Sequence, residues 1–244
     1  MGETNTPLLP QMNDLWQQTL KWQPSGEQQC QFQRLYELIL LGNSQLNLTR
    51  ITAPPEFWEK HLWDSLRGIA RRLQPSVPDV APTMQRVIDI GTGAGFPGIP
   101  VAIVQPSWSV TLLDSTQKKI AFLNTCLAQM GIQNANTVIG RAEEVGKLPQ
   151  YRRTYDIALV RAVGSASVCA EYALPLLKPG GLAILYRGHW TSGEAEALQS
   201  TLKQLGGVIE AVEEFATPVS QSIRHCLYLR LVAATPADKI YRKK

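Results

Sequence analysis

The chain has 244 residues, of which 44% are hydrophobic and 18% charged, so it can bury a sizeable core. No apolar run approaches the roughly 20 residues that span a bilayer, and the N-terminus lacks a secretion signal, so we expect a cytoplasmic protein without membrane contact. A net charge of +4 is too small to establish a polyanionic partner, and four scattered cysteines with three histidines predict no metal site.

The first seventy-odd residues have the spacing of amphipathic helices. Apolar residues recur every three or four positions in 31–42, where Gly42 is the expected C-cap, and again in 56–73 after a Pro-Pro start. Three prolines then break the pattern. The sequence therefore predicts an N-terminal helical appendage over residues 1–73 and a linker over residues 74–84.

After the linker, short apolar runs alternate with longer amphipathic ones, which is typical of a doubly wound α/β fold with a mostly parallel sheet. Two final strands follow each other with no helix between them and predict an antiparallel C-terminal hairpin. We expect this main domain over residues 85–235, followed by a basic tail over residues 236–244. The expected strands are 86–90, 109–114, 136–140, 155–162, 182–187, 208–219 and 223–233, with a helix over 116–130.

Residues 87–100, VIDIGTGAGFPGIP, carry four glycines directly after the first expected strand. Where such a strand turns into a helix, glycines let a ligand lie against the bare backbone, whose N–H groups point into the crevice. Asp114, at the end of the second strand, is placed to accept hydrogen bonds from both hydroxyls of a ribose. The sequence therefore predicts a cofactor that contains adenosine.

Three interpretations of the glycine turn compete. Gly93, Gly95 and Gly98 match a dinucleotide fingerprint in form, but this match begins two residues beyond the strand end at Gly91. Asp89 adds negative charge where a pyrophosphate would lie, which disfavours NAD and suits the cationic groups of S-adenosylmethionine. We therefore expect S-adenosylmethionine, with a dinucleotide or a turn without ligand as the alternatives.

Residues 87–123 resemble the cofactor-binding core of the RsmG (GidB) family, which methylates N7 of a guanine in bacterial small-subunit ribosomal RNA. The resemblance covers about residues 35–232, and its most specific part is GFPGIP combined with LLDS and with the upstream LNLT. It implies a Rossmann-like class I S-adenosylmethionine-dependent methyltransferase that acts, as a monomer, on small-subunit ribosomal RNA or a 30S-type particle. Family members often have Lys-Gly where this chain has Arg187-Gly188, and the first thirty residues have no counterpart.

The resemblance also implies a set of site residues. Phe96 is explained equally well as a packing residue, and Arg161 could bind the methionine carboxylate, the RNA or a structural acid. No catalytic residue is firmly assigned, although Arg161 and Arg187 are candidates at the lip of the site. The implied cofactor contacts are Gly91, Phe96, Asp114, Ser115, Thr116, Ala142, Glu143 and Arg161.

Basic residues before the glycine turn predict an RNA footprint. Arg67 and Arg71 are four residues apart, and Lys60 lies two turns before Arg67, so an α-helix would present them on one face. The alternative is that the arginines cover apolar surface or pair with Glu56 and Glu59. The predicted RNA-binding residues are Lys60, Arg67, Arg71, Arg72 and Arg187.

The implied methyl transfer requires the protein to bind and align the reactants. Guanine N7 carries a lone pair and no proton, so it can attack the sulfonium methyl group directly, without a general base. The chain accordingly lacks an Asn-Pro-Pro-aromatic motif for exocyclic amines. Two other functions stay open at this point, an NAD-dependent oxidoreductase and an RNA-binding protein that retains the fold without the activity.

Overall fold

The structure of the protein is a computed structural model that describes residues 6–73 and 84–233. Nearly all of the predicted linker, and the whole of the predicted basic tail, lie outside the described residues. None of the helices within the described ranges is both long enough and apolar enough to cross a membrane.

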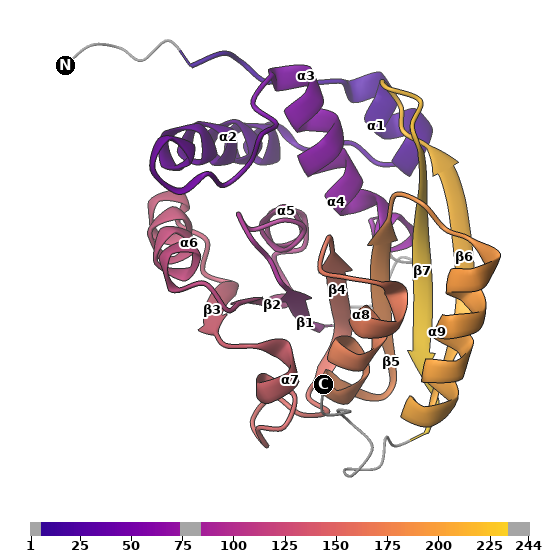
Figure 1. Ribbon diagram of the computed structural model, residues 1–244. Coiled ribbons are helices and arrows are strands. Elements are labelled where there is room, and N and C mark those ends of the chain that lie inside the picture. Colours follow the sequence, from indigo (N-terminus) through magenta and orange to yellow (C-terminus); the bar gives the residue numbers. More distant parts are fainter. Residues whose placement is uncertain (1–5, 74–83, 234–244) are drawn as a thin grey trace.

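A seven-stranded sheet forms the centre of the molecule, in the order β3-β2-β1-β4-β5-β7-β6 (Figure 1). The first five strands pair in parallel, and β7 pairs antiparallel with both β5 and β6. The predicted fold class, a mostly parallel sheet closed by an antiparallel hairpin, is confirmed. The strands are β1 Arg86–Ile90, β2 Ser109–Asp114, β3 Ala135–Ile139, β4 Tyr155–Arg161, β5 Leu177–Arg187, β6 Gly207–Ala216 and β7 Ile223–Leu231.

Helices cover both faces of the sheet (Figure 1). One face packs against α7, α8 and α9, and the other packs against α5, α6 and the N-terminal helices, whose Ser65 and Gly68 carbonyl oxygens accept hydrogen bonds from Tyr186 of β5 and Tyr228 of β7. Crossover helices on both faces explain why the central strands are apolar along their length. The helices are α1 Asn13–Leu20, α2 Gly26–Leu46, α3 Pro54–Phe57, α4 Asp64–Arg67, α5 Gly98–Val104, α6 Gln117–Met130, α7 Ala142–Val145, α8 Ala166–Ala173 and α9 Ser192–Leu205, with single turns η2 Ala70–Arg72 and η3 Leu174–Leu176.

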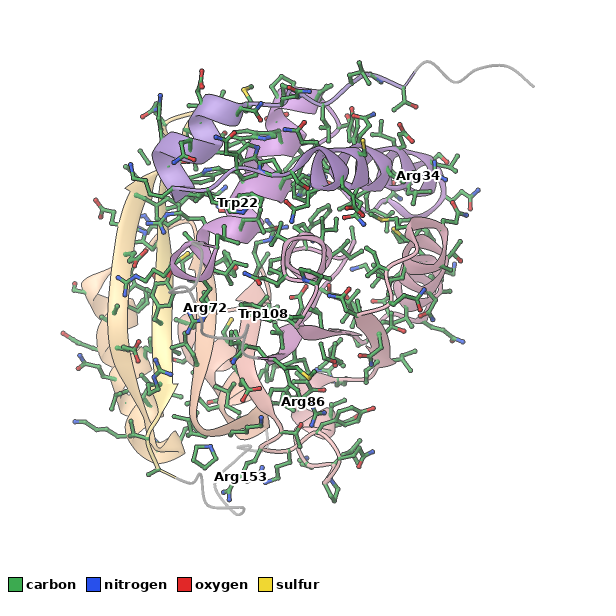
Figure 2. All side chains as sticks on the ribbon, turned by 180° about the vertical axis from the view of Figure 1, so that it is seen from behind. Trp22, Arg34, Arg72, Arg86, Trp108 and Arg153 are labelled. Carbon is green, nitrogen blue, oxygen red and sulfur yellow. The ribbon has the colours of Figure 1, made fainter. Side chains whose placement is uncertain are left out.

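The N-terminal helices share one apolar core with the sheet. Trp16, Phe32 and Trp58 belong to the same buried cluster as Val87 of β1 and Leu112 of β2. Figure 2 shows the side chains of these helices filling the space above the sheet. The division into an appendage and a main domain stays a prediction, and the contact between the two parts is extensive.

The predicted C-cap at Gly42 is wrong. Helix α2 continues to Leu46 and ends at Asn47, whose φ of 48° is left-handed. Gly42 lies inside the helix, where the Phe122 ring of α6 packs against it and occupies the space that a Cβ would need. This close packing between α2 and α6 has no local signal in the sequence.

The helix expected over 56–73 is not regular. Between α3 and α4 the chain forms a π-helical segment, η1 (Trp58–Trp63), and beyond α4 it tightens into the short turn η2. Buried Glu59 of η1 accepts hydrogen bonds from the backbone N–H groups of Val219 and Ser220 (2.6 and 2.8 Å) in the β6–β7 turn. Because a π-helical turn shifts the register of all later residues, Lys60 and Arg67 do not share a face as they would in an α-helix.

Candidate functional site

A cavity of about 390 Å³ lies at the carboxyl ends of β1, β2, β3 and β4. In doubly wound sheets this edge is where ligands bind, because the strand-to-helix turns there leave backbone groups free. The lining residues are Ile90, Gly91, Leu113, Asp114, Ser115, Thr116, Lys119, Gly140, Arg141, Ala142, Glu143, Ala162, Val163 and Tyr172.

The glycine turn between β1 and α5 presents bare backbone to this end of the sheet. Gly91, Gly93 and Gly95 have φ values of 70°, 62° and 99°, a region that other residues rarely adopt. Within residues 6–73 and 84–233, a Cβ built on Gly93 would meet only the carbonyl oxygen of Gly91, at 3.9 Å. The space beside Gly93 is therefore open to a ligand.

Asp89 lies beneath this turn and organises it. Its carboxylate is fully buried, and Oδ2 accepts hydrogen bonds from the Thr92 hydroxyl (2.6 Å) and the Gly98 N–H (2.8 Å). Burial raises the pKa of Asp89 to about 6, because desolvation disfavours the charged form. The carboxylate does not line the cavity, and its hydrogen bonds hold the shape of the turn.

Asp114 connects the turn to the cavity. Its Oδ2 accepts a hydrogen bond from the Gly93 N–H (3.0 Å), and its Oδ1 accepts one from the Thr116 N–H (2.8 Å). Each carboxylate oxygen can accept a second hydrogen bond, so both oxygens keep capacity for a ribose hydroxyl. Lys119 lies 3.9 Å from Oδ2 and supplies a compensating positive charge.

The structure brings together most, but not all, of the predicted cofactor contacts. Phe96 and Arg161 do not line the cavity. Phe96 is buried behind the turn, where its ring stacks on His61 with centroids 4.5 Å apart. The predicted contacts that do line the cavity are Gly91, Asp114, Ser115, Thr116, Ala142 and Glu143.

Arg161 points toward the N-terminal helices. Its Nη1 donates hydrogen bonds to the backbone oxygen of Lys60 (2.8 Å) and to Oδ2 of Asp64 (3.0 Å). The guanidinium also lies 5.7 Å from the centre of the Phe96 ring. Of the three partners considered for Arg161 in the sequence, the structure shows the structural acid.

Arg187, the other candidate at the lip, is also held by protein groups. Its Nη1 donates to the carbonyl oxygen of Gly164, and its Nη2 pairs with Oε1 of Glu194, both at 2.6 Å. The side chain is 19% exposed. Arg187 thus contacts the loop after β4 rather than pointing freely into solvent.

Several cavity residues had not been identified from the sequence. Ala162 and Val163 directly follow Arg161 in the recognised LVRAV motif, and Lys119 lies about one helical turn after Asp114, so position along the chain could have indicated them. Tyr172 comes from α8, and only the packing of that helix against the sheet brings it to the cavity.

The predicted RNA-binding residues do not form one stripe. Lys60 pairs with Glu56 (2.6 Å), whereas Arg67 and Arg71 both pair with Glu213 of β6 (2.9 and 2.6 Å). The guanidinium of Arg67 also lies 4.5 Å from the centre of the Phe215 ring. Arg67 and Arg71 therefore form ion pairs, as the alternative prediction held, but their partner is Glu213 and not Glu56 or Glu59.

Arg72 lies near the opposite end of β5 from Arg187. Burial and the neighbouring charge of Arg230 lower the pKa of Arg72, and Arg230 is paired with Leu182 in the sheet. Leu182 is five residues before Arg187 along β5, a separation of about 16 Å. The RNA contacts stay a prediction, and the geometry favours Lys60 and Arg187 over Arg72 as neighbours of the cavity.

Replacing Arg67 and Arg71 together with Gln should lower stability without affecting the cavity. We expect the free energy of unfolding to fall by about 2 kcal/mol, because Glu213 loses both charged partners. The salt dependence of RNA binding should stay the same, since both guanidinium groups are already paired. RNA affinity measured at several salt concentrations checks this, and a slope flattened by about 0.7 to 0.9 per lost phosphate contact would support the RNA footprint instead.

Buried His61 should make the protein sensitive to acid. Burial, with the nearby charges of Arg161 and Lys60, lowers the pKa of His61 to about 3. Between about pH 6.5 and pH 3 the unfolded chain therefore binds a proton that the folded protein does not, so stability falls by about 1.4 kcal/mol per pH unit as the pH drops. Urea unfolding at pH 7, 6 and 5 should show a smaller loss in His61→Gln than in the wild type.

The matched control for this prediction is His189→Gln, which changes an exposed histidine. Asp89 acts in the opposite sense, because its raised pKa makes the folded protein hold a proton between about pH 4 and pH 6. Asp89 is present in the wild type and in both histidine variants, so its contribution is the same in all three proteins and does not affect the difference between them. An unchanged pH dependence in His61→Gln would contradict the prediction.

Comparisons with known proteins agree with this geometry. The family described as "GidB: rRNA small subunit methyltransferase G" matches residues 28–225. The chain is 65% identical over 233 residues to the Ribosomal RNA small subunit methyltransferase G of Nostoc punctiforme, covering 96% of this chain and 94% of that protein. It is 60% identical to the protein of the same name from Trichormus variabilis, with the same coverage.

Among solved structures, cofactor-bound Rv0187 from MTB is similar with a TM-score of 0.54 at 18% sequence identity, covering 82% of this chain and 90% of that chain. This likeness concerns the fold alone, whereas the family is established by the matched residues and by the identity to the two relatives. The resemblance seen in the glycine turn is therefore confirmed, and the chain belongs to the rRNA small subunit methyltransferase G (GidB) family.

Proposed function

We propose that the protein transfers the methyl group of S-adenosylmethionine to N7 of a guanine in small-subunit ribosomal RNA. The observation that carries the proposal is the cavity lined by Gly91 and Asp114, whose carboxylate accepts a hydrogen bond from the N–H of neighbouring Gly93, a residue with open space beside it. Membership in a family of rRNA methyltransferases supports the reaction class and the RNA substrate.

The residues around the cavity fit this cofactor. The open space beside Gly93 admits the chain that joins the methionine to the sugar, and Asp114 has acceptor capacity for the ribose. Ala142 and Glu143 follow β3 and lie where an adenine would be bound. The negative charges of Asp89 and Asp114 suit a cationic ligand better than a pyrophosphate, so the dinucleotide alternative is not favoured.

The mechanism requires binding and orientation rather than proton transfer. When bound, S-adenosylmethionine supplies an electrophilic methyl group to the N7 lone pair. Guanine N7 has no proton to lose, so none of the chain's residues needs to act as a base. The protein's contribution is to align the two reactants and to exclude water, with the glycine turn and Asp114 on the cofactor side and Ala162 and Val163 on the β4 side.

The proposal also covers the oligomeric state, the cellular compartment and the form of the RNA substrate. We infer that the protein works as a monomer in the cytoplasm, on small-subunit RNA or on a 30S-type particle, without a metal ion. Lys60 and Arg187 are the proposed RNA contacts nearest the cavity. Each is held by an acidic partner, Glu56 and Glu194 respectively, so RNA phosphates would compete with these carboxylates.

One labelling experiment tests the function. The protein is incubated with methyl-labelled S-adenosylmethionine and either bulk RNA, 30S-type particles or DNA, and the labelled base is identified. We expect label at guanine N7 of the small-subunit RNA. Cofactor binding without label on any substrate would instead indicate an RNA-binding protein without activity, and binding of NAD in place of S-adenosylmethionine would indicate an oxidoreductase.

A further inference from the structure

The residues Ala162, Val163 and Gly164, here called the β4 loop, are held from both sides by ion pairs that lie outside the cavity. We propose that Asp64 and Glu194 are positioning residues, which fix Arg161 and Arg187 and through them hold the β4 loop in the shape that the cofactor requires. This inference rests on the proposed function, because it treats the cavity as the cofactor site.

The β4 loop has an unfavourable backbone shape. Ala162 has a φ of 56°, a left-handed conformation that residues with a Cβ rarely adopt. Such a conformation persists only where the surrounding structure imposes it. Ala162 and Val163 both line the cavity, and Cγ2 of Val163 lies 2.6 Å from the place that a Cβ on Gly91 would take. The loop therefore sets how much room remains above Gly91.

The first contact acts at the beginning of the loop. Arg161 immediately precedes Ala162, and its guanidinium pairs with Asp64 of α4 at 3.0 Å. The two side chains are only 15% and 10% exposed, so little solvent screens their charges. The backbone oxygen of Lys60 accepts a second bond from the same Nη1 (2.8 Å). The N-terminal helices thus fix the direction in which the chain leaves β4.

The second contact acts at the end of the loop. Arg187, the last residue of β5, donates from Nη1 to the carbonyl oxygen of Gly164. Its Nη2 is held by Glu194 in the first turn of α9. Within the described residues the buried Nε of Arg187 has no partner, so the position of the guanidinium depends on the Glu194 and Gly164 contacts.

Neither carboxylate lines the cavity, yet each decides where one end of the loop lies. Without Asp64, the poorly hydrated Arg161 has to move toward solvent or another acceptor, and Ala162 can relax out of its left-handed conformation. Val163 would then shift over Gly91, where the methionine end of the cofactor is expected. Cofactor affinity should fall although no cofactor contact has been removed.

The test compares Asp64→Asn and Glu194→Gln with the wild type. We expect each variant to bind S-adenosylmethionine about tenfold more weakly in calorimetry, and to exchange the amide hydrogens of the β4 loop faster in the absence of ligand. The double variant with Asp64→Asn and Arg161→Gln should lose little more cofactor affinity than either single variant, because both substitutions remove the same contact.

Glu213→Gln is the matched control. Glu213 also joins the N-terminal helices to the sheet, through Arg67, and its side chain is similarly buried at 16% exposed, but it does not line the cavity. This variant should lower the unfolding temperature while cofactor affinity and exchange in the β4 loop stay as in the wild type.

The inference is overturned if Asp64→Asn and Glu194→Gln affect only the unfolding temperature, as Glu213→Gln is expected to do. The proposed function fails in a different way, namely if the wild type does not bind S-adenosylmethionine at all. Exchange of the β4 loop, measured without ligand, then still decides whether the two carboxylates hold the loop.

Discussion

Gly93→Val should abolish methyl transfer while the protein remains folded. Among the described residues, the Gly91 carbonyl oxygen alone lies within 4 Å of a Cβ at this position, so the valine methyl groups would project into the open space that we assign to the cofactor. The φ of 62° is also unfavourable for a β-branched residue, which would shift the backbone N–H that Asp114 binds. We expect a loss of kcat/KM greater than about a hundredfold, since misplacements of about 1 Å have effects of this size.

Gly131→Val is the matched control for this variant. Gly131 has a φ of 66°, and a Cβ there would meet nothing within 4 Å in the part of the chain that the structure describes, but Gly131 ends α6 and does not line the cavity. The control should therefore show the same backbone strain and comparable instability, with methyl transfer retained. Steady-state kinetics and thermal unfolding of both variants separate the two effects, and normal turnover in Gly93→Val would mean that the glycine serves only the geometry of the turn.

Asp114→Ala should weaken the binding of S-adenosylmethionine by at least about a hundredfold. The substitution removes charge-assisted hydrogen bonds to the two ribose hydroxyls, each contributing about 1.5 to 3 kcal/mol. It also removes the hydrogen-bond acceptor of the Gly93 and Thr116 N–H groups, so the glycine turn is no longer held against the end of β2. Calorimetric titration of the cofactor measures the effect directly.

Asp156→Ala provides the comparison for this measurement. Asp156 likewise accepts a backbone N–H, that of Arg86 (2.8 Å), and pairs with a lysine, Lys178 (2.7 Å), but it lies at the amino end of β4. We expect it to lower stability and to leave cofactor affinity unchanged. Equal affinities for Asp114→Ala and the wild type would remove Asp114 from the cofactor site.

The sequence determined the central sheet and the glycine turn at its carboxyl edge. The strands predicted at 86–90 and 109–114 coincide with β1 and β2, because buried parallel strands are short apolar runs whose signal is local. The glycine turn was also evident, since positive φ at Gly91 and Gly93 depends on residue type rather than on distant contacts. Asp114 followed from its place at the end of β2.

The tertiary structure decided what the charged and aromatic side chains do. For Arg161 and Phe96 the sequence left both a cofactor contact and a structural role open, and in the fold α4 gives Arg161 an acidic partner while η1 gives Phe96 a stacked histidine. Arg67 and Arg71 meet Glu213 because β6, far away in sequence, lies beside the N-terminal helices. A long side chain can reach several partners, and local sequence does not specify which one the fold brings within reach.

Local patterns were also least informative where packing overrides helix geometry. Gly42 has the residue type of a C-cap, but in the structure it allows the Phe122 ring to pack closely against α2. The apolar spacing of 56–73 does not reveal the π-helical turn, from which Glu59 reaches the β6–β7 turn. The sequence by itself thus determined the sheet, the glycine turn and the cofactor class, which depend on local backbone preferences and strand burial. The fold alone decided which acids pair with Arg67 and Arg161, because those contacts join segments about 100 residues or more apart in the chain.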